Sequence, residues 1–197
     1  MVNGDRGQAH TLEGIAAALL VLSSVVFALQ VTAVTPLTAS TASQHVETQY
    51  RGASQGVLAS AAADDLLRPT LLYWDETNAT FYDATIEGYY VDGGPPTAFG
   101  TFLVNTYDEA GVAYNVDLTY VAADGSLRQR ELVHGGEPSD TAVTATRTVA
   151  LYDSDRLRTH NHERSTQPLV NATYFAPDAY DGHLYNVVVV EVTVWRM

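Results

Sequence analysis

Side chains of the kind that bind metal ions cluster at one place in the sequence, the segment His160-Asn-His162-Glu163. Two histidines at positions i and i+2 face the same way on a strand, and Asp153 and Asp155 lie close by in the sequence. A zinc site needs three or four convergent ligands and groups that orient them, and this spacing is not that of an HExxH motif. We therefore interpret the segment as a solvated polar loop, and we keep His160, His162, Asp153 and Asp155 as the candidate metal ligands.

Calcium is the other ion for which the sequence offers ligands, because Asp153-Ser-Asp155, Asp178 and Asp181 carry carboxylate oxygens. A complete EF-hand loop is absent from the sequence, and acidic loops are expected in a chain with 23 Asp and Glu residues. We therefore expect no resident metal ion and no cofactor.

The sequence lacks the motifs of nucleophilic catalysis and of phosphate binding. It has no Gly-x-Ser-x-Gly elbow, no cysteine and no Ser-x-x-Lys. Asp92-Gly-Gly-Pro-Pro96 reads as a turn, because proline removes the amides that a phosphate would need. We expect no catalytic residue, and a surface enzyme of unrecognised type is kept only as a third hypothesis.

Two patterns for covalent modification are present. Asn78-Ala-Thr80 and Asn171-Ala-Thr173 are N-glycosylation acceptor patterns, and neither has proline at its middle position. We keep Asn78 and Asn171 as candidate glycosylation sites on the extracytoplasmic part of the chain.

The charge of the chain is unusual in size and in kind. The net charge is −13, all ten cations are Arg, and there is no Lys. Residues 71–197 carry seven Arg and eighteen acids, and such a field repels nucleic acid and anionic lipid. An acid-rich, lysine-free composition resembles that of proteins from halophilic archaea, which work in molar salt; an ordinary acidic exoprotein is the alternative. Because the chain has no cysteine, we expect packing alone to stabilise it.

A long stretch without charged residues near the N-terminus determines where all of these residues lie relative to a membrane. Residues 14–46 contain no Asp, Glu, Lys or Arg, and the run from Ile15 to Leu29 is apolar apart from Ser23 and Ser24. With its extension to Val34, the run forms roughly 30 Å of helix, the thickness of a bilayer's hydrocarbon core. We predict a transmembrane helix over residues 14–35. The alternative is a cleaved secretory signal, for which Val31-Thr32-Ala33 is an acceptable site.

The leader before this stretch carries a more specific pattern. Arg6-Gly7-Gln8, followed by Glu13 and an apolar helix, resembles the class III signal of archaeal type IV pilin-like proteins. The resemblance implies that a prepilin-type peptidase cuts after Gly7 or Gln8, that the helix becomes the packing core of a filament, and that Glu13 pairs with a neighbouring subunit's α-amine. The alternative is that Glu13 only favours a helix N-terminus. The first 45 residues or so also look like an uncharacterised haloarchaeal group of membrane-anchored proteins related to pilins.

Local patterns predict the remaining elements. Apolar residues recur at helical spacing from Gln44 to Arg68, where Arg68-Pro69 gives a stop signal. Pro36, between the two helical stretches, bends a helix or stops it. From Leu71 onward, apolar runs and period-2 alternation predict strands over Phe99–Tyr107, Val112–Tyr120, Ser126–Val133, Val143–Leu151 and a central Leu184–Trp195, with a weaker one over Phe81–Tyr90. Short connections at 108–111 and 122–125 predict hairpins and a meander of five to six antiparallel strands.

The predicted fold class is α+β, with a long N-terminal helix (membrane span plus amphipathic stalk) and a C-terminal antiparallel β-sheet head. We expect a leader over 1–13, the span over 14–35, a helical stalk over 36–69 and an extracytoplasmic head over 70–197. The first functional hypothesis is a pilin-like subunit or minor pilus component that meets the membrane and other pilin-like subunits through its helix. The second is a single-span anchored domain that binds a ligand or partner and never polymerises. Neither hypothesis involves nucleic acid.

Overall fold

The computed structural model describes residues 4–91 and 93–196, with side chains described for 11–29 and for 48–196 apart from 92 and 109. Residues 1–3 of the predicted leader and Asp92 of the predicted turn lie outside the described residues. The chain divides into two compact units, Met1–Val46 and Glu47–Met197.

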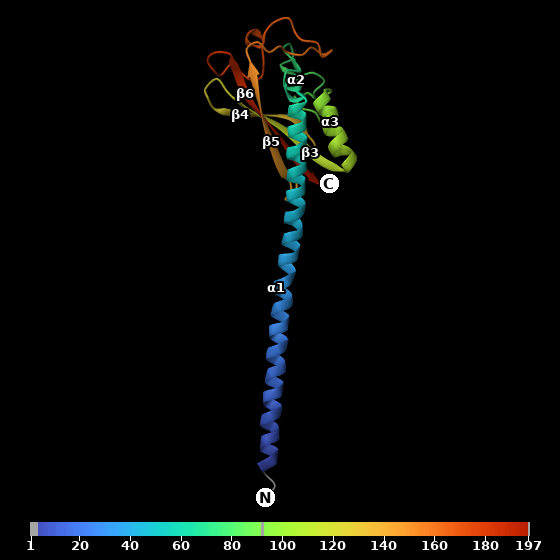
Figure 1. Ribbon diagram of the computed structural model, residues 1–197, viewed down its shortest axis with the longest axis vertical. Helices are drawn as coiled ribbons and strands as arrows, with labels where there is room; N and C mark the ends of the chain where they lie inside the picture. The colour runs from blue at the N-terminus through green and yellow to red at the C-terminus, as the bar shows by residue number, and fades with distance from the viewer. Residues whose placement is uncertain (1–3, 92, 197) are drawn as a thin grey trace. The chain divides into compact units, whose positions relative to one another are not determined.

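The first unit consists of the N-terminal part of α1, the helix Gly4–Ala63 (Figure 1). The backbone stays helical at Pro36, so the proline does not end the helix. Every residue from 11 to 29 is exposed, and the 19 residues Thr11–Leu29 have a mean hydropathy of 2.3. By length and composition this stretch is able to cross a membrane, or to act as a signal. Ser24 donates its hydroxyl hydrogen to the Val21 carbonyl (2.8 Å), which satisfies that hydroxyl within its own helix.

The second unit is built on a four-stranded antiparallel sheet of β3 (Val112–Val121), β4 (Leu127–His134), β5 (Val143–Tyr152) and β6 (Leu184–Arg196). The spatial order is β4-β3-β6-β5, which confirms the central position of the last strand. The predicted meander of five to six strands is wrong, because β6 returns to lie between β3 and β5. Two further strands, β1 (Trp74–Asp75) and β2 (Thr80–Phe81), form a separate pair.

The predicted strand over Phe99–Tyr107 is instead the helix α3 (Ala98–Tyr107). Thr97 caps it, since its side-chain oxygen accepts a hydrogen bond from the Gly100 amide. Phe99, Leu103 and Tyr107, four residues apart, are its buried residues together with Gly100. The hairpin expected at 108–111 is therefore wrong too: a 3₁₀ turn, η1 (Asp108–Ala110), and left-handed Gly111 connect α3 to β3.

The weaker predicted strand over Phe81–Tyr90 is also wrong for most of its length. Only Phe81 belongs to a strand, β2, and turns follow it. Tyr90 forms an isolated parallel bridge with Val133. Its amide donates to the Leu132 carbonyl (3.0 Å) and its carbonyl accepts from His134 (2.8 Å), so this loop is tied to the edge strand β4.

The second predicted helix ends earlier than expected, at Ala63 rather than Arg68. Asp65 takes the left-handed conformation (φ 50°), and its amide donates to the Ala62 carbonyl (3.2 Å) while the Leu66 amide donates to Ala61 (2.9 Å). These two bonds are those of a Schellman C-cap. Pro69 then falls in the first turn of the short helix α2 (Leu67–Leu71), where proline is tolerated and gives no stop.

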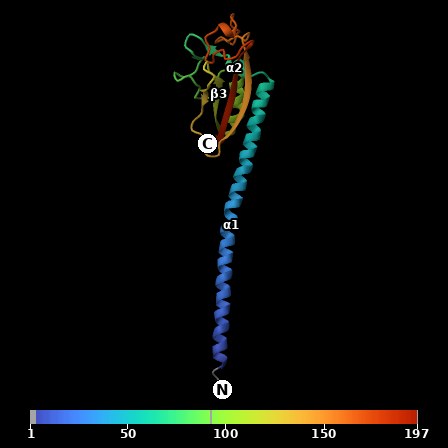
Figure 2. The same cartoon turned by 90° about the vertical axis from the view of Figure 1, so that its left-hand side faces the viewer.

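The core of the second unit lies between this sheet and helices α1 and α3. Leu58 and Ala61 from the last turns of α1 are buried together with Phe99 and Leu103 of α3. Figures 1 and 2 show the last turns of α1 along one face of the sheet. The strands contribute their inward residues to the same cluster, among them Val116, Leu118, Leu132, Ala145, Val149, Val188, Val190 and Val192. The α+β class with an antiparallel C-terminal sheet is thus confirmed.

Candidate functional site

One small cavity of the second unit has four arginines among its lining residues. It measures about 140 Å³, and we name it the arginine pocket; its walls are Asp65, Arg68, Pro69, Leu72, Ser154, Asp155, Arg156, Arg158 and Arg164. Four of the ten cations of a chain with a net charge of −13 therefore meet in one small space.

A small hairpin brings two of these arginines together. Arg158 and Arg164 form an antiparallel bridge, closed by a bond from the Thr159 amide to the Glu163 carbonyl (2.9 Å) and one from Ser165 to Leu157 (2.8 Å). Opposite residues in such a bridge present their side chains on the same face. Like charges in this position repel each other, so the repulsion between the two guanidinium groups destabilises the hairpin.

The other two arginines come from α2 and from the segment just before the hairpin. Arg156 precedes Arg158 by two residues, and its Nη1 donates to the carbonyls of Ser165 and Thr166. Arg68 belongs to α2, and its guanidinium lies over the Tyr152 ring at 5.6 Å. The Arg158 amide donates to the Leu72 carbonyl just after α2 (2.7 Å), which ties the hairpin to that helix.

The pocket has two carboxylates in its walls, Asp65 and Asp155, against four guanidinium groups. Among the described residues, only one ion pair involves these four guanidinium groups, that of Arg68 Nη1 with Asp155 Oδ1 at 4.0 Å. The second carboxylate oxygen of Asp155 accepts the Tyr152 amide (2.8 Å). The Nε atoms of Arg68 and Arg158 are buried and have no hydrogen-bond partner among the residues that the structure describes. The pocket therefore has an excess of donors and of positive charge.

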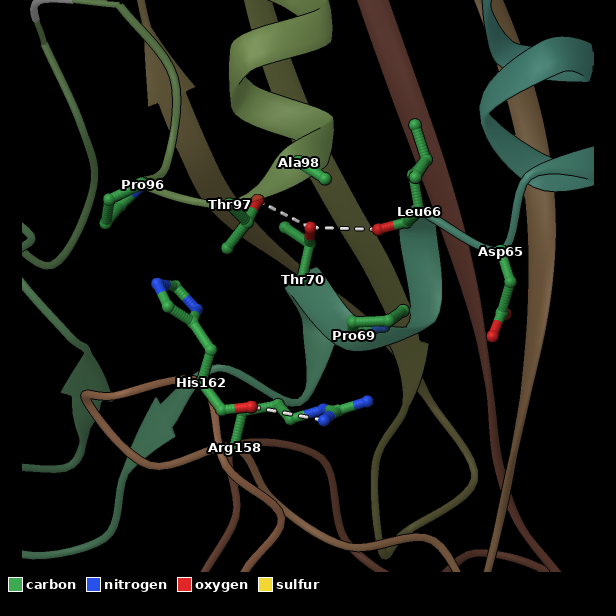
Figure 3. A pocket seen from close by; sticks show the side chains of 9 residues that line it. All are labelled: Asp65, Leu66, Pro69, Thr70, Pro96, Thr97, Ala98, Arg158 and His162. Carbon is green, nitrogen blue, oxygen red and sulfur yellow. Dashed lines mark hydrogen bonds between the residues drawn. The ribbon is translucent and has the colours of Figure 1, made fainter.

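A larger cavity of about 310 Å³ shares Asp65, Pro69 and Arg158 with the arginine pocket. Figure 3 shows it from close by, with Arg158 donating to the His162 carbonyl (3.1 Å). Its other walls are Leu66, Thr70, Pro96, Thr97, Ala98 and His162.

Two threonine hydroxyls fix the back of this cavity. Thr70 and Thr97 are 2.7 Å apart, and the Thr70 hydroxyl donates to the Leu66 carbonyl (3.0 Å). Thr97 then donates to Thr70 while it accepts the Gly100 amide. This relay joins the start of α3 to α2 across the cavity wall.

Arg130, outside the arginine pocket, is a guanidinium that aromatic rings surround, although its Nε, like those of Arg68 and Arg158, is buried without a hydrogen-bond partner among the described residues. Arg130 lies 4.7 Å from the ring centre of Trp74 and 5.8 Å from that of Phe81, and burial lowers the pKa of Arg130. Aromatic faces balance this cation. Of the four arginines in the arginine pocket, only Arg68 has such a ring contact among the described residues.

The candidate metal ligands do not converge. His160 Nε2 lies 3.2 Å from Asp83 Oδ1, whereas His162 stacks on Tyr73, with ring centres 4.7 Å apart and planes at 14°. The two rings part because His162 has a positive φ (62°), which breaks the alternation of a strand. Asp155 lies in the arginine pocket and Asp153 Oδ1 is buried. Within the described part of the chain, no three His, Cys, Asp or Glu residues form a group able to hold a metal.

The two candidate glycosylation sites are both exposed. The Asn78 amide donates to Asp75 Oδ2 (2.7 Å), and Asn171 ends the 3₁₀ turn η2 (Leu169–Asn171). Glu76 Oε1 accepts the Thr173 amide (2.8 Å), which brings the segments of the two acceptor patterns together. Glycosylation itself stays a prediction.

The candidate processing residues lie at the start of α1. Arg6, Gly7 and Gln8 belong to its first turns, and their side chains lie outside the described residues. Glu13 is exposed, two residues inside the apolar stretch Thr11–Leu29.

The arginine pocket is absent from the sequence-based candidates, although a signal for it exists. Arg156, Arg158 and Arg164 place three of the ten cations within nine residues, and the first two alternate as on a strand. The histidines and aspartates of the same segment carry the more familiar pattern of metal ligands. The contribution of Arg68, about ninety residues earlier, has no local signal.

Comparisons with known proteins give one match. The sequence profile of DUF7288, a family of unknown function, matches residues 6–194. No curated protein and no solved structure matches the chain.

Proposed function

Because the chain belongs to DUF7288, a family of unknown function, we propose its function from its own geometry: a pilin-like structural subunit, or a minor pilus component, on the surface of a halophilic archaeon. The observation that carries the proposal is α1. This helix runs from Gly4 to Ala63, exposes a membrane-length apolar stretch near its start, and contributes Leu58 and Ala61 to the core of a β-sheet domain near its end.

The apolar stretch supports assembly as well as anchoring. Ten large apolar side chains between Leu12 and Leu29 are more than half exposed, and so large an apolar surface needs lipid or another protein to cover it. Small residues along the same stretch permit close approach of a second helix in lipid. They are Gly14, Ala16, Ala17, Ala18, Ser23 and Ser24.

The domain order of the proposal follows the sequence. A prepilin-type peptidase cuts within the leader, residues 1–13, after Gly7 or Gln8, so that Glu13 stays in the mature chain. Residues 14–35 span the membrane before assembly, 36–69 form the stalk, and 70–197 form the extracytoplasmic head. In the assembled filament, Glu13 pairs with the α-amine of a neighbouring subunit, because a carboxylate in an apolar helix bundle requires a charged partner.

The native N-terminus tests the processing step. Intact-mass or N-terminal analysis of the protein from its own cells is expected to give a chain that starts at Gln8 or Ala9. A start at Val34 means a freed exoprotein. A start at Met1 or Val2 means a plain anchor and contradicts the pilin-like proposal.

Charge reversal at Glu13 tests the assembly step. We expect Glu13→Lys to insert into the membrane but to be missing from filaments that are sheared from cells and sedimented. Asp140→Lys is the matched control, since it makes the same change of charge at an exposed residue between β4 and β5. Filaments of Glu13→Lys that equal those of the control in amount would remove the role assigned to Glu13.

The second candidate is a single-span anchored domain that binds a ligand and does not polymerise. The arginine pocket favours it, because a subunit with a purely structural role has no need of four arginines around one cavity. Sedimentation separates the two candidates. A processed protein that stays in the membrane fraction under conditions that shed filaments supports the anchored domain.

A further inference from the structure

We propose that the arginine pocket binds a small oxyanion, a phosphate, sulfate or carboxylate group that is either free or carried at the end of a larger molecule. The site is assembled by Arg68, Arg156, Arg158 and Arg164. The inference does not depend on whether the chain polymerises, because every one of these residues belongs to the second unit.

The first argument is charge. Arg158 and Arg164 oppose each other across a bridge, and among the described residues the pocket's guanidinium groups have one ion pair, at 4.0 Å. The chain has 23 acidic residues from which closer partners could come. Four guanidinium groups against the two carboxylates of Asp65 and Asp155 leave the pocket with an excess of positive charge, which attracts an anion from solution.

The second argument is that the donors are held in place before any anion arrives. Arg156 Nη1 is bonded to the Ser165 and Thr166 carbonyls, and Arg158 Nη1 to the His162 carbonyl. These bonds restrict the side chains, and the buried Nε of Arg158 has no hydrogen-bond partner in the described part of the chain. A site whose donors are fixed in advance loses less side-chain entropy on binding.

The third argument is the shape of the donor groups. A guanidinium presents its N–H groups as a planar fork, which matches the two oxygens of a carboxylate, phosphate or sulfate. Chloride offers a single point charge and cannot use the fork in this way. The pocket is therefore expected to prefer oxyanions to halides.

The fourth argument is size. The pocket holds about 140 Å³, less than the 300 Å³ or so at which cavities for drug-sized ligands begin. It has room for one oxyanion group and not for a nucleotide. The neighbouring cavity of about 310 Å³ shares Arg158 with it, so a molecule with an anionic end has space there for its uncharged body.

Calorimetric titration of the full chain in non-ionic detergent tests the proposal, with inorganic phosphate as the probe and sodium chloride at matched ionic strength as the reference. We expect saturable binding of phosphate and a rise of the thermal midpoint with phosphate that chloride does not reproduce. Phenyl phosphate, run in parallel, distinguishes the two sources of the anion. Equal affinity indicates a free oxyanion, and tighter binding of phenyl phosphate indicates that a ligand body uses the neighbouring cavity.

Substitution of a pocket arginine locates the binding. Arg164→Gln, at an exposed side chain without an ion pair among the described residues, is expected to weaken phosphate binding at least about tenfold, the loss that follows removal of a hydrogen bond to a charged group. Arg164→Lys keeps the charge but not the fork, and is expected to weaken binding as well. Arg128→Gln on the exposed part of β4 removes the same charge away from the pocket and is expected to leave the affinity unchanged.

Three results would overturn the proposal. One is phosphate binding no stronger than chloride binding at the same ionic strength. Another is equal weakening by Arg164→Gln and Arg128→Gln, which would indicate attraction by overall charge alone. The third is unchanged affinity in an Arg164→Gln protein whose circular dichroism shows it to be folded.

Discussion

Asp117 is a carboxylate that the sheet places between two other acidic residues. It pairs in register with Glu131 on β4 and with Glu191 on β6, so three acids lie side by side across three strands. Partial burial, and then the charges of Glu131 and Glu191, raise the pKa of Asp117, and a hydrogen bond from Gln129 opposes the shift. Like charges directly opposite each other on a sheet are destabilising.

A raised pKa in the folded state fixes the sign of the pH dependence. The folded protein binds the Asp117 proton more tightly than the unfolded chain does, so this group favours folding at acid pH. That contribution is lost as the pH rises through the raised pKa, and the destabilisation is complete at neutral pH.

Asp117→Asn is therefore expected to raise the free energy of unfolding at pH 7 by about 0.5 kcal/mol, with solvent screening taken into account. The gain is expected to vanish below the ordinary carboxyl pKa. Urea unfolding at several pH values, followed by the fluorescence of Trp74 and Trp195, measures both quantities. Asp140→Asn, the same change at an exposed loop residue, is the control. A gain that is equal in both variants, or independent of pH, would contradict the assignment.

At the scale of elements, the position of α3 depends on a close backbone approach. A Cβ atom at Gly100 would lie 1.8 Å from the Pro95 carbonyl oxygen, and one at Gly94 would lie 2.7 Å from the Gly100 Cα. Both contacts are with backbone atoms, which cannot rotate out of the way as the end of a side chain can. The chain before α3 therefore folds tightly over the first turn of the helix, beside the relay from Thr97 to Thr70.

Gly100→Ala is expected to lower the free energy of unfolding by about 3 kcal/mol, because the added methyl group forces Pro95 and α3 apart. Gly56→Ala is the matched control. Gly56 is an exposed residue of α1 with nothing within 4 Å of the added Cβ, and the same substitution there is expected to stabilise the protein by up to about 1 kcal/mol. Thermal unfolding of the two variants compares them directly, and destabilisation of equal size in both would refute the close approach.

The elements also show how far local sequence decides structure. The inward residues Val116 and Leu118 alternate with polar neighbours, and β3 forms where that alternation predicts it. The run from Ala98 to Tyr107 is mostly apolar and fits a strand or a helix by pattern alone; the deciding signal is Thr97, whose capping role depends on its contact with Gly100.

Other features have no signal in the local sequence. The helix α1 ends at a Schellman cap with Asp65 in place of the usual glycine, so the usual sequence sign of a helix end is missing. The place of β6 between β3 and β5 depends on pairing with both strands and on burial of its alternate valines on one face, which only the whole sheet decides. The arginine pocket likewise requires α2 and the hairpin of residues 157–165 to meet.

At the scale of the whole molecule, the dominant fact is charge. Eighteen acids and seven arginines lie in residues 71–197, and four of those arginines face aromatic rings or the arginine pocket. The acids of the surface therefore have few cations to pair with, and they repel one another over distances that depend on salt. The Debye length falls from about 10 Å at 0.1 M salt to about 3 Å at 1 M, so salt removes most of this repulsion.

The thermal midpoint of the full chain in non-ionic detergent is therefore expected to rise with sodium chloride, by about 5 °C between 0.01 and 1 M. Screening predicts that most of the rise occurs in this range, whereas preferential exclusion of a solute continues to act at higher concentrations. Sucrose at matched osmolality serves as the control, because it strengthens burial without screening charge. A midpoint that is unchanged by salt, or that sucrose raises as much, would show that self-repulsion does not limit stability. The acid-rich, lysine-free composition would then be that of an ordinary acidic exoprotein rather than an adaptation to molar salt.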